Sequence, residues 1–422
     1  MLRKVVDVRP GEGRALLWSF AYFFCLLAGY YVLRPLRDEM GIVGGVKNLQ
    51  WMFTATFVVM LAAVPLFGAI VAKLPRRRFI PLVYHFFVAN IAIFWALLFA
   101  GIDTPAVARV FFVWISVFNL FAVSVFWSFM ADLWASEQGK RLFGFIAAGG
   151  SAGALLGPLL TVVLVKAIGP MNLLIVAAVL LELAVLCAGR LESAQVDRDR
   201  SGPGLRGDEI GGGWLAGLAM VLRSPYLAGI ALWVALLSLA GTFLYFQQAT
   251  IVAAASGDSA ERTRIFAAID LAVGVLTIGV QFIATGRLIA RFGVGAAAAF
   301  LPLVFAIGFV MLAWAPMVGV VMAFQALQRT ANFAISNPAR EVLFTVLDRE
   351  EKYKAKNVID IVVFRGADAL WAWLAALLRS AGLELASISL AVVPVTAVWL
   401  VLALALGRSQ ERRARSAAAS EV

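Results

Sequence analysis

Charged side chains interrupt several stretches of this sequence that are otherwise almost entirely apolar. Arg34, Arg37, Asp38 and Glu39 lie within six residues at the end of one such stretch, and Arg329 lies within another. A guanidinium can hold a carboxylate or phosphate through two parallel hydrogen bonds. A buried carboxylate can bring its pKa into the working pH range. These residue types predict a site for an anionic solute, with acids that balance its charge or couple its movement to an ion.

The polar residues around Arg329 form the clearest pattern. Gln325, Gln328, Arg329 and Asn332 fall on one face of a 3.6-residue helix. Arg329 lies near the middle of the apolar stretch 317–339, out of easy reach of either end. We interpret this stripe as part of a solute site. A structural ion pair between helices is the alternative.

The first charged run surrounds Pro35, so we expect a broken or terminating helix there. Its mixed signs permit local pairing of Arg34 or Arg37 with Asp38 or Glu39. Anchoring at the membrane interface by tyrosine and arginine is the alternative reading.

Further polar residues complete the predicted site. Arg365 and Asp368 can pair at i, i+3, and three aromatic residues could stack on a planar ring. The predicted substrate-binding residues are Arg34, Arg37, Arg329, Arg365, Gln325, Gln328, Asn332, Asn119, Tyr31, Tyr245, Gln248 and Trp371. The predicted coupling or charge-balancing residues are Asp38, Glu39, Asp270, Asp360 and Asp368.

The elements that must position these residues are membrane-spanning helices. Hydrophobic residues make up 62% of the 422 residues and charged residues only 14%, and crossing a bilayer takes about 20 apolar residues in a helix. We predict an all-α polytopic membrane protein with about twelve spans. They lie near 15–34, 50–73, 79–100, 107–131, 143–166, 171–190, 226–254, 263–286, 294–315, 317–339, 357–379 and 386–407.

The basic residues predict the topology. Lys and Arg gather in alternate loops, including 76–78, 352–356 and the tail 408–415, while the intervening loops are short and poor in bases. By the positive-inside rule, both termini are cytoplasmic, and we expect a bacterial inner membrane. The net charge of +11 is then a topology signal, and we expect no nucleic-acid partner. The charged N-terminus runs into the first span without a small-residue cleavage site, so we expect that span to be retained.

The spans divide into two halves. We predict an N-terminal six-helix bundle (1–190), a polar glycine-rich cytoplasmic linker (191–213), a C-terminal six-helix bundle (214–407) and a basic cytoplasmic tail (408–422). A G-x-x-x-A-[K/R]-x-[P/G] pattern begins at Gly68 after the second span and recurs at Gly286 after the eighth. This repetition indicates an internal duplication.

The repeated pattern resembles the loop motif of the major facilitator superfamily. The family's acid is replaced here by Ala72 and its glycine by Pro75, so the carboxylate to which the family's latch is attributed is missing from this loop. The fifth span carries Gly144, Gly153, Gly157 and Pro158, a spacing similar to a motif of exchangers in this superfamily. Close helix packing through small residues explains the same glycines equally well.

Three further groups of residues resemble the ATP/ADP antiporter (nucleotide transporter) family of bacteria and plastids. That family has an L-R-D-T-K-D run, an F-W-x-F-A-[N/D] segment before an E-x-x-K-R loop, and D-P-x-K-E before L-D-E-x-x-K-x-K-x-K and I-D-V-V. The corresponding residues here are 33–38, 126–132 with 137–141, and 337–341 followed by 347–356 and 359–362. The resemblance implies nucleotide exchange.

The departures from this family bear on the substrate. Typical members carry glutamates in the fourth and seventh spans, where 115–119 and 241–242 are uncharged here, and a lysine near the place of Asp368. A smaller or different anion therefore stays open.

We predict a secondary transporter of an anionic solute, with a nucleotide or a phosphorylated metabolite as the candidate substrate. It would work by exchange or ion coupling, with the two halves rocking around a site near mid-membrane. A proton or a counter-exchanged solute would drive it. We expect a monomer that is not an enzyme and needs no cofactor or metal, and the chain has no G-x-x-x-x-G-K-[S/T] motif for ATP hydrolysis. The alternatives are a proton-coupled exporter of amphipathic molecules and a non-transporting sensor or scaffold with a transporter fold.

Overall fold

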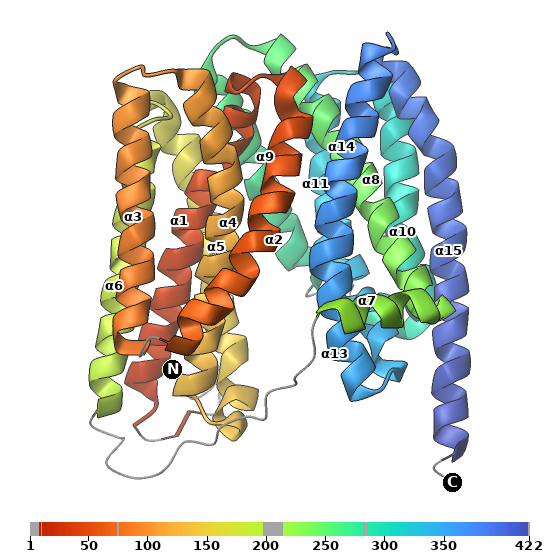
Figure 1. The fold of residues 1–422 in the computed structure, drawn as a ribbon, viewed down its shortest axis with the longest axis horizontal. Helices are drawn as coiled ribbons and strands as arrows, with labels where there is room; N and C mark the ends of the chain where they lie inside the picture. The colour runs from red at the N-terminus through yellow and green to blue at the C-terminus, as the bar shows by residue number, and fades with distance from the viewer. Residues whose placement is uncertain are drawn as a thin grey trace. The chain divides into compact units, whose positions relative to one another are not determined.

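The computed structural model describes residues 8–9, 11–73, 76–196, 214–281, 283 and 286–420. Helices dominate this part of the chain, and it contains no strand (Figure 1). The α-helices are α1 (Gly13–Val43), α2 (Leu49–Lys73), α3 (Arg76–Phe99), α4 (Thr104–Leu133), α5 (Ser136–Ile168), α6 (Leu173–Val196), α7 (Trp214–Arg223), α8 (Pro225–Ala255), α9 (Ser259–Val280), α10 (Gly286–Trp314), α11 (Val318–Ala331), α12 (Asn337–Leu343), α13 (Arg349–Asn357), α14 (Phe364–Ser380) and α15 (Leu385–Ser420).

Eleven stretches of helix within the described residues are long and apolar enough to cross a membrane. The tenth predicted span is not among them because α11 has only 14 residues. A π-helical turn, η4 (Asn332–Ser336), continues it directly into α12. The helix therefore continues from Val318 to Leu343 with a change of winding. The predicted all-α polytopic fold is confirmed.

Local signals explain where individual helices begin and end. The carboxylate of Asp103 accepts a hydrogen bond from the backbone N–H of Ala106, and Pro105 lies in the first turn, so these residues cap α4. At the end of α5, Gly169 has φ 82°, a left-handed conformation that favours glycine.

The chain forms two compact units, and each takes in part of a helix from the other half of the sequence. Unit 1 comprises residues 1–45, 58–206 and 256–271, and unit 2 comprises 46–57, 207–255 and 272–422. Helix α6 extends to Val196, into the start of the predicted linker, and 197–213 lie outside the described residues. Helix α15 continues as far as Ser420, through most of the predicted tail.

Unit 1 is built around α1, which packs against α4, α5 and α6. Tyr22 on α1 donates a hydrogen bond to the hydroxyl of Tyr84 on α3 (2.7 Å), and Tyr84 donates to the carbonyl of Ala122 on α4 (3.0 Å). The Tyr22 ring also meets Phe126 edge to face, with ring centroids 4.9 Å apart. These contacts give the apolar core a polar chain in which both hydroxyls have partners.

The glycines of α5 bring it close to α1. A Cβ added at Gly157 would lie 2.6 Å from the carbonyl oxygen of Ala28, and one added at Gly153 would overlap the backbone of Phe24. At Gly144, by contrast, a Cβ would meet nothing within 4 Å. Helix packing therefore accounts for Gly153 and Gly157.

Unit 2 has α8 at its centre, with α14 and α15 packed against it. Helices α10 and α15 run side by side (Figure 1), and Gly295 and Gly407 allow their backbones to approach. Two of the π-helical turns in the described part of this unit are η4 and η6 (Val358–Val363), and η6 lies directly before α14. Such turns re-aim the side chains on either side of them, and they are frequent at functional sites.

Candidate functional site

The charged run of unit 1 lies within a continuous helix. Helix α1 extends from Gly13 to Val43 with Pro35 inside it, so the prediction of a broken or terminating helix was wrong. Proline removes one backbone hydrogen bond, but packing against neighbouring helices can hold such a helix together in a membrane. Pro35 is buried, and two of the charges near it, Arg34 and Glu39, have partners outside α1.

Arg34 pairs with Asp270 of α9, both within unit 1. The distance between Arg34 Nη1 and Asp270 Oδ1 is 3.1 Å. Of the local pairs that the sequence permits, Arg37 with Asp38 is present at 3.7 Å. The Arg37 guanidinium also lies over the ring of Phe112, 4.2 Å from its centroid.

Glu39 makes a different kind of pair, which we call the closed pair. Arg262 at the start of α9 donates two hydrogen bonds to the Glu39 carboxylate, from Nε (2.8 Å) and from Nη2 (2.6 Å). The Nη1 of Arg262 donates to the carbonyl of Ser256. Glu39 is 0% exposed. This geometry fits a structural role, since the carboxylate is enclosed and both its oxygens are used.

Two other predicted residues of unit 1 are Tyr31 and Asn119. The Tyr31 ring meets that of Tyr30 edge to face at 5.3 Å, and the Arg34 guanidinium lies 5.7 Å from its centroid. Asn119 is a half-buried residue of α4, and no hydrogen bond or ion pair joins it to the others within the described part of the chain. Tyr31 therefore belongs to the Arg34 group, and Asn119 is not joined to it.

In unit 2, side-chain amides form a chain between α8 and α11. Gln328 Nε2 donates to Gln325 Oε1 (2.7 Å), and Gln325 Nε2 donates to Gln248 Oε1. All three side chains are buried. Arg329 is half-buried directly after Gln328, and Asn332 opens the π turn η4. The predicted polar stripe is therefore linked to α8 through its glutamines.

Asp368 of α14 is held by two helices of unit 2. It accepts a hydrogen bond from Ser238 of α8 (2.6 Å) and lies 3.5 Å from the hydroxyl of Thr242, one turn further along α8. Arg365 Nη1 lies 3.3 Å from its other oxygen, which is the predicted i, i+3 pair. Three groups thus share the negative charge of one buried carboxylate.

The remaining predicted residues of unit 2 have other partners. Trp371 donates its indole N–H to the carbonyl of Ala235 (2.9 Å), and Tyr245 packs edge to face on Phe53. Asp360, in the π turn η6, pairs with Arg340 of α12 at 3.2 Å. Asp360 therefore pairs with α12 and does not belong to the Arg365 group.

Arg34 and Arg365 are presented in a similar way, and we call their contacts with Asp270 and Asp368 the open pairs. The Arg34 side chain is 20% exposed and that of Asp270 only 2%, while Arg365 is 31% exposed and Asp368 12%. In each pair the acid is the more buried partner and the guanidinium the more exposed one, and one guanidinium nitrogen contacts the acid. Such an arginine keeps donors for a further anion while its charge is balanced from behind.

Sequence reasoning missed several of these partners, among them Arg262, Ser238 and Thr242. Arg262 lies between the seventh and eighth predicted spans, in one of the loops that are poor in bases, so an arginine at this place is a signal that could have found it. Ser238 and Thr242 are hydroxyls at i and i+4 in an otherwise apolar run, which places them on one face of α8.

The long apolar helices and the ion pairs between them define a polytopic membrane protein. The chain belongs to the Major Facilitator Superfamily, whose family model matches residues 19–352. This confirms the superfamily that the repeated loop motif resembles. The family and fold are those of transporters rather than of enzymes.

Solved structures with a similar fold include three transporters. A bacterial homologue of the iron transporter ferroportin in an inward-facing state has a TM-score of 0.65 at 14% identity, over 93% of this chain and 98% of that chain. The nucleoside transporter NupG has 0.64 at 13%, over 94% and 98%. An inward-facing, unoccupied bacterial homologue of the human lysosomal transporter Spinster has 0.52 at 17%, over 96% and 98%. No curated protein matches the sequence significantly.

Proposed function

We propose that this protein is a secondary transporter of an anionic solute, working by alternating access in a bacterial inner membrane with both termini in the cytoplasm. The observation that carries the proposal is a pair of partly exposed guanidinium groups, Arg34 in unit 1 and Arg365 in unit 2. Each pairs with an acid that is more buried than the arginine. Arginine suits carboxylate and phosphate because its planar fork donates two parallel hydrogen bonds.

The arginines, the amide chain and their acids take separate roles in this proposal. Arg34, Arg37, Arg329 and Arg365 bind the anion, and the amide chain of Gln325, Gln328 and Gln248 supplies neutral hydrogen-bonding groups. Asp270 and Asp368 balance the arginines while no substrate is bound. Glu39 we reassign from coupling to structure because Arg262 encloses it.

The substrate class we favour is a nucleotide or a phosphorylated metabolite, moved by exchange or with a coupled ion. The resemblance of residues 33–38, 126–141 and 337–362 to the ATP/ADP antiporters supports this choice. The exporter alternative loses part of its support because Gly153 and Gly157 are explained by the packing of α5 on α1.

The test is counter-exchange in proteoliposomes. Vesicles holding the purified protein are loaded with ADP, phosphate or buffer, and uptake of labelled ATP is followed. We expect uptake that needs the internal nucleotide and falls about tenfold or more in Arg34→Gln and Arg365→Gln, since a charge-assisted hydrogen bond contributes about 1.5–3 kcal/mol. Arg223→Gln, on an exposed arginine at the end of α7, is the matched control and should transport normally.

Two results would contradict the proposal. Dye efflux driven by a pH gradient, with no anion uptake, would favour the exporter. Absence of flux and of thermal stabilisation across a panel of anionic metabolites would favour a non-transporting protein.

A further inference from the structure

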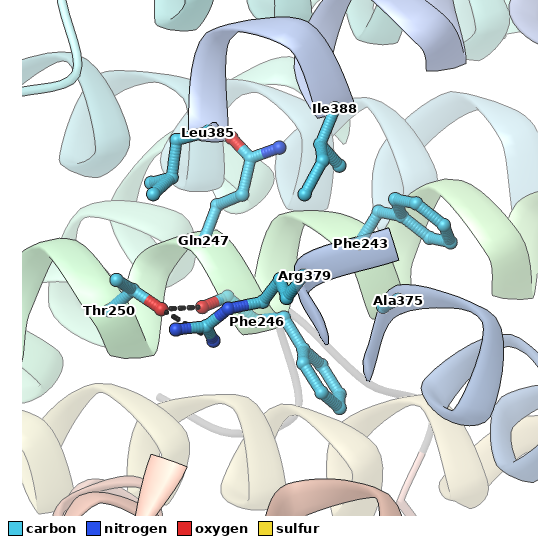
Figure 2. Close-up of a pocket in the computed structure, with 8 residues that line it drawn as sticks. All are labelled: Phe243, Phe246, Gln247, Thr250, Ala375, Arg379, Leu385 and Ile388. Atoms are coloured by element: carbon cyan, nitrogen blue, oxygen red, sulfur yellow. Dashed lines mark hydrogen bonds between the residues drawn. The ribbon is translucent and has the colours of Figure 1, made fainter. Parts of the chain in front are cut away.

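A small pocket in unit 2 lies outside the candidate solute site. It is formed by α8, the end of α14 and the start of α15, beside the short connection 381–384 (Figure 2). Its polar lining comes from Arg379, Thr250 and Gln247, and its apolar walls include Phe246, Leu385 and Ile388. None of these residues belongs to the groups around Arg34, Arg329 or Arg365.

Arg379 is half-buried, and no carboxylate pairs with it within the described residues. Arg34, Arg262, Arg340 and Arg365 each contact an acid. Arg379 instead donates one hydrogen bond, from Nη1 to the hydroxyl oxygen of Thr250 (3.0 Å), as Figure 2 shows. The Thr250 hydroxyl in turn donates to the carbonyl of Phe246 (2.9 Å). The charge of this guanidinium therefore has no anion to balance it among those residues.

Gln247 provides a second, independent observation. Its side chain is buried, with 4% exposure, and its Oε1 accepts a hydrogen bond from Ser389 (2.8 Å). Its Nε2 has no acceptor within the described part of the chain. Figure 2 shows the amide at the wall of the pocket, between Leu385 and Ile388. Buried donors in proteins nearly always have an acceptor, so an amide left without one inside a pocket points to a bound group that supplies it.

The polar and apolar residues that line the pocket indicate the class of ligand that it binds. An unbalanced guanidinium and an unused N–H both call for an acceptor that carries negative charge, such as a carboxylate or a phosphate. The walls of Phe246, Leu385 and Ile388 offer only hydrocarbon. We propose that this pocket binds an anionic amphiphile, with its acid group on Arg379 and Gln247 Nε2 and its hydrocarbon chain against the apolar walls.

The test measures the melting temperature of the full-length protein in a neutral maltoside detergent. The probe is dodecyl phosphate, compared with dodecanol, which has the chain without the charge, and with inorganic phosphate, which has the charge without the chain. We expect stabilisation by dodecyl phosphate alone. Arg379→Gln should weaken its apparent affinity about tenfold or more, because the charged hydrogen bonds are lost. Gln247→Leu should weaken it several-fold through the loss of one donor.

Arg264→Gln is the matched control, since it removes an exposed arginine of α9 outside the pocket, and it should leave the response unchanged. If Arg379→Gln does not fold, Arg379→Lys keeps the charge without the planar fork and should bind dodecyl phosphate more weakly than the unaltered protein. Equal stabilisation by dodecanol, or an unchanged response in the Arg379 variants, would overturn the proposal.

A second arm identifies the source of the amphiphile. The protein is placed in nanodiscs of phosphatidylglycerol or of phosphatidylcholine, and dodecyl phosphate is added to each. If an anionic membrane lipid occupies the pocket, the response should disappear in phosphatidylglycerol and persist in phosphatidylcholine. If the pocket serves a free amphiphile, the response should persist in both. A response in neither lipid would contradict the proposal.

Discussion

The two units hold their buried polar groups in different ways. In unit 1, besides the hydrogen bond of Tyr22 with Tyr84, arginines link helices through ion pairs with buried acids. These pairs are Arg34 with Asp270, Arg262 with Glu39, and Arg141 with Glu12. In unit 2 the buried links between helices come from neutral donors: Gln325 to Gln248, Ser389 to Gln247, and Ser238 to Asp368. The ion pairs that do join helices in unit 2, such as Lys356 with Glu341, involve more exposed acids.

This difference has an energetic consequence. Separating a buried ion pair leaves an uncompensated charge, so each such link tolerates only one arrangement. An amide or hydroxyl can exchange one acceptor for another at a smaller cost. We infer that unit 1 is the more rigidly specified unit, while the polar groups of unit 2, beside two π turns, can rearrange more readily.

The largest expected effect comes from the closed pair of unit 1. Arg262→Gln leaves the Glu39 carboxylate charged and 0% exposed, so it should destabilise the protein by about 3–5 kcal/mol. Asp270→Asn leaves Arg34, which is 20% exposed, and should cost less, about 1–2 kcal/mol, because solvent can reach the guanidinium. Thermal unfolding in detergent measures both.

The control is the double variant Arg262→Gln/Glu39→Gln. It removes both charges and should recover much of the loss seen with Arg262→Gln alone. A double variant no more stable than the single one would show that unit 1 does not depend on this charge pair.

A smaller effect is expected where unit 2 holds its acid with a hydroxyl. Ser238→Ala removes the 2.6 Å hydrogen bond to Asp368 and should cost about 1.5–3 kcal/mol, the usual range for a hydrogen bond to a charged group. Thr242→Val keeps the shape at a hydroxyl 3.5 Å away and should cost about 0.5 kcal/mol or less. Equal losses in the two variants would argue against Ser238 as the main support of Asp368.

Much of this architecture could be predicted from the sequence because the bilayer sets the length of each apolar run. The third predicted span, 79–100, corresponds to α3 (Arg76–Phe99), and the seventh, 226–254, to α8 (Pro225–Ala255). The i, i+3 pair of Arg365 with Asp368 was also predictable, since helical geometry alone brings such residues together.

The partners that cross between helices could not be predicted in the same way. Arg34 and Asp270 are far apart in the chain, and the packing of α1 with α9 decides that they meet. The sequence offered Asp38 and Glu39 as closer partners, and it gave Pro35 as a reason for a break that packing prevents. The π turns at Asn332 and Val358 likewise carry no simple sequence signature.

The smallest expected effect is a difference in how the stability of the two units depends on pH. Burial raises the pKa of Glu12, but hydrogen bonds from the backbone N–H of Arg9, from Gln138 and from Arg141 outweigh it and hold that pKa below its usual range. The stabilisation is therefore complete above the unfolded-state pKa, about 4.3, and is lost as the pH falls through the lower pKa of the folded protein. Glu12→Gln should remove this part of the acid-induced loss of melting temperature. Glu341→Gln in unit 2 removes an exposed ion pair and should change stability by only about 0–1 kcal/mol. A larger effect at Glu341 than at Glu12 would reverse the contrast between the units, since it would place the stronger electrostatic link in unit 2.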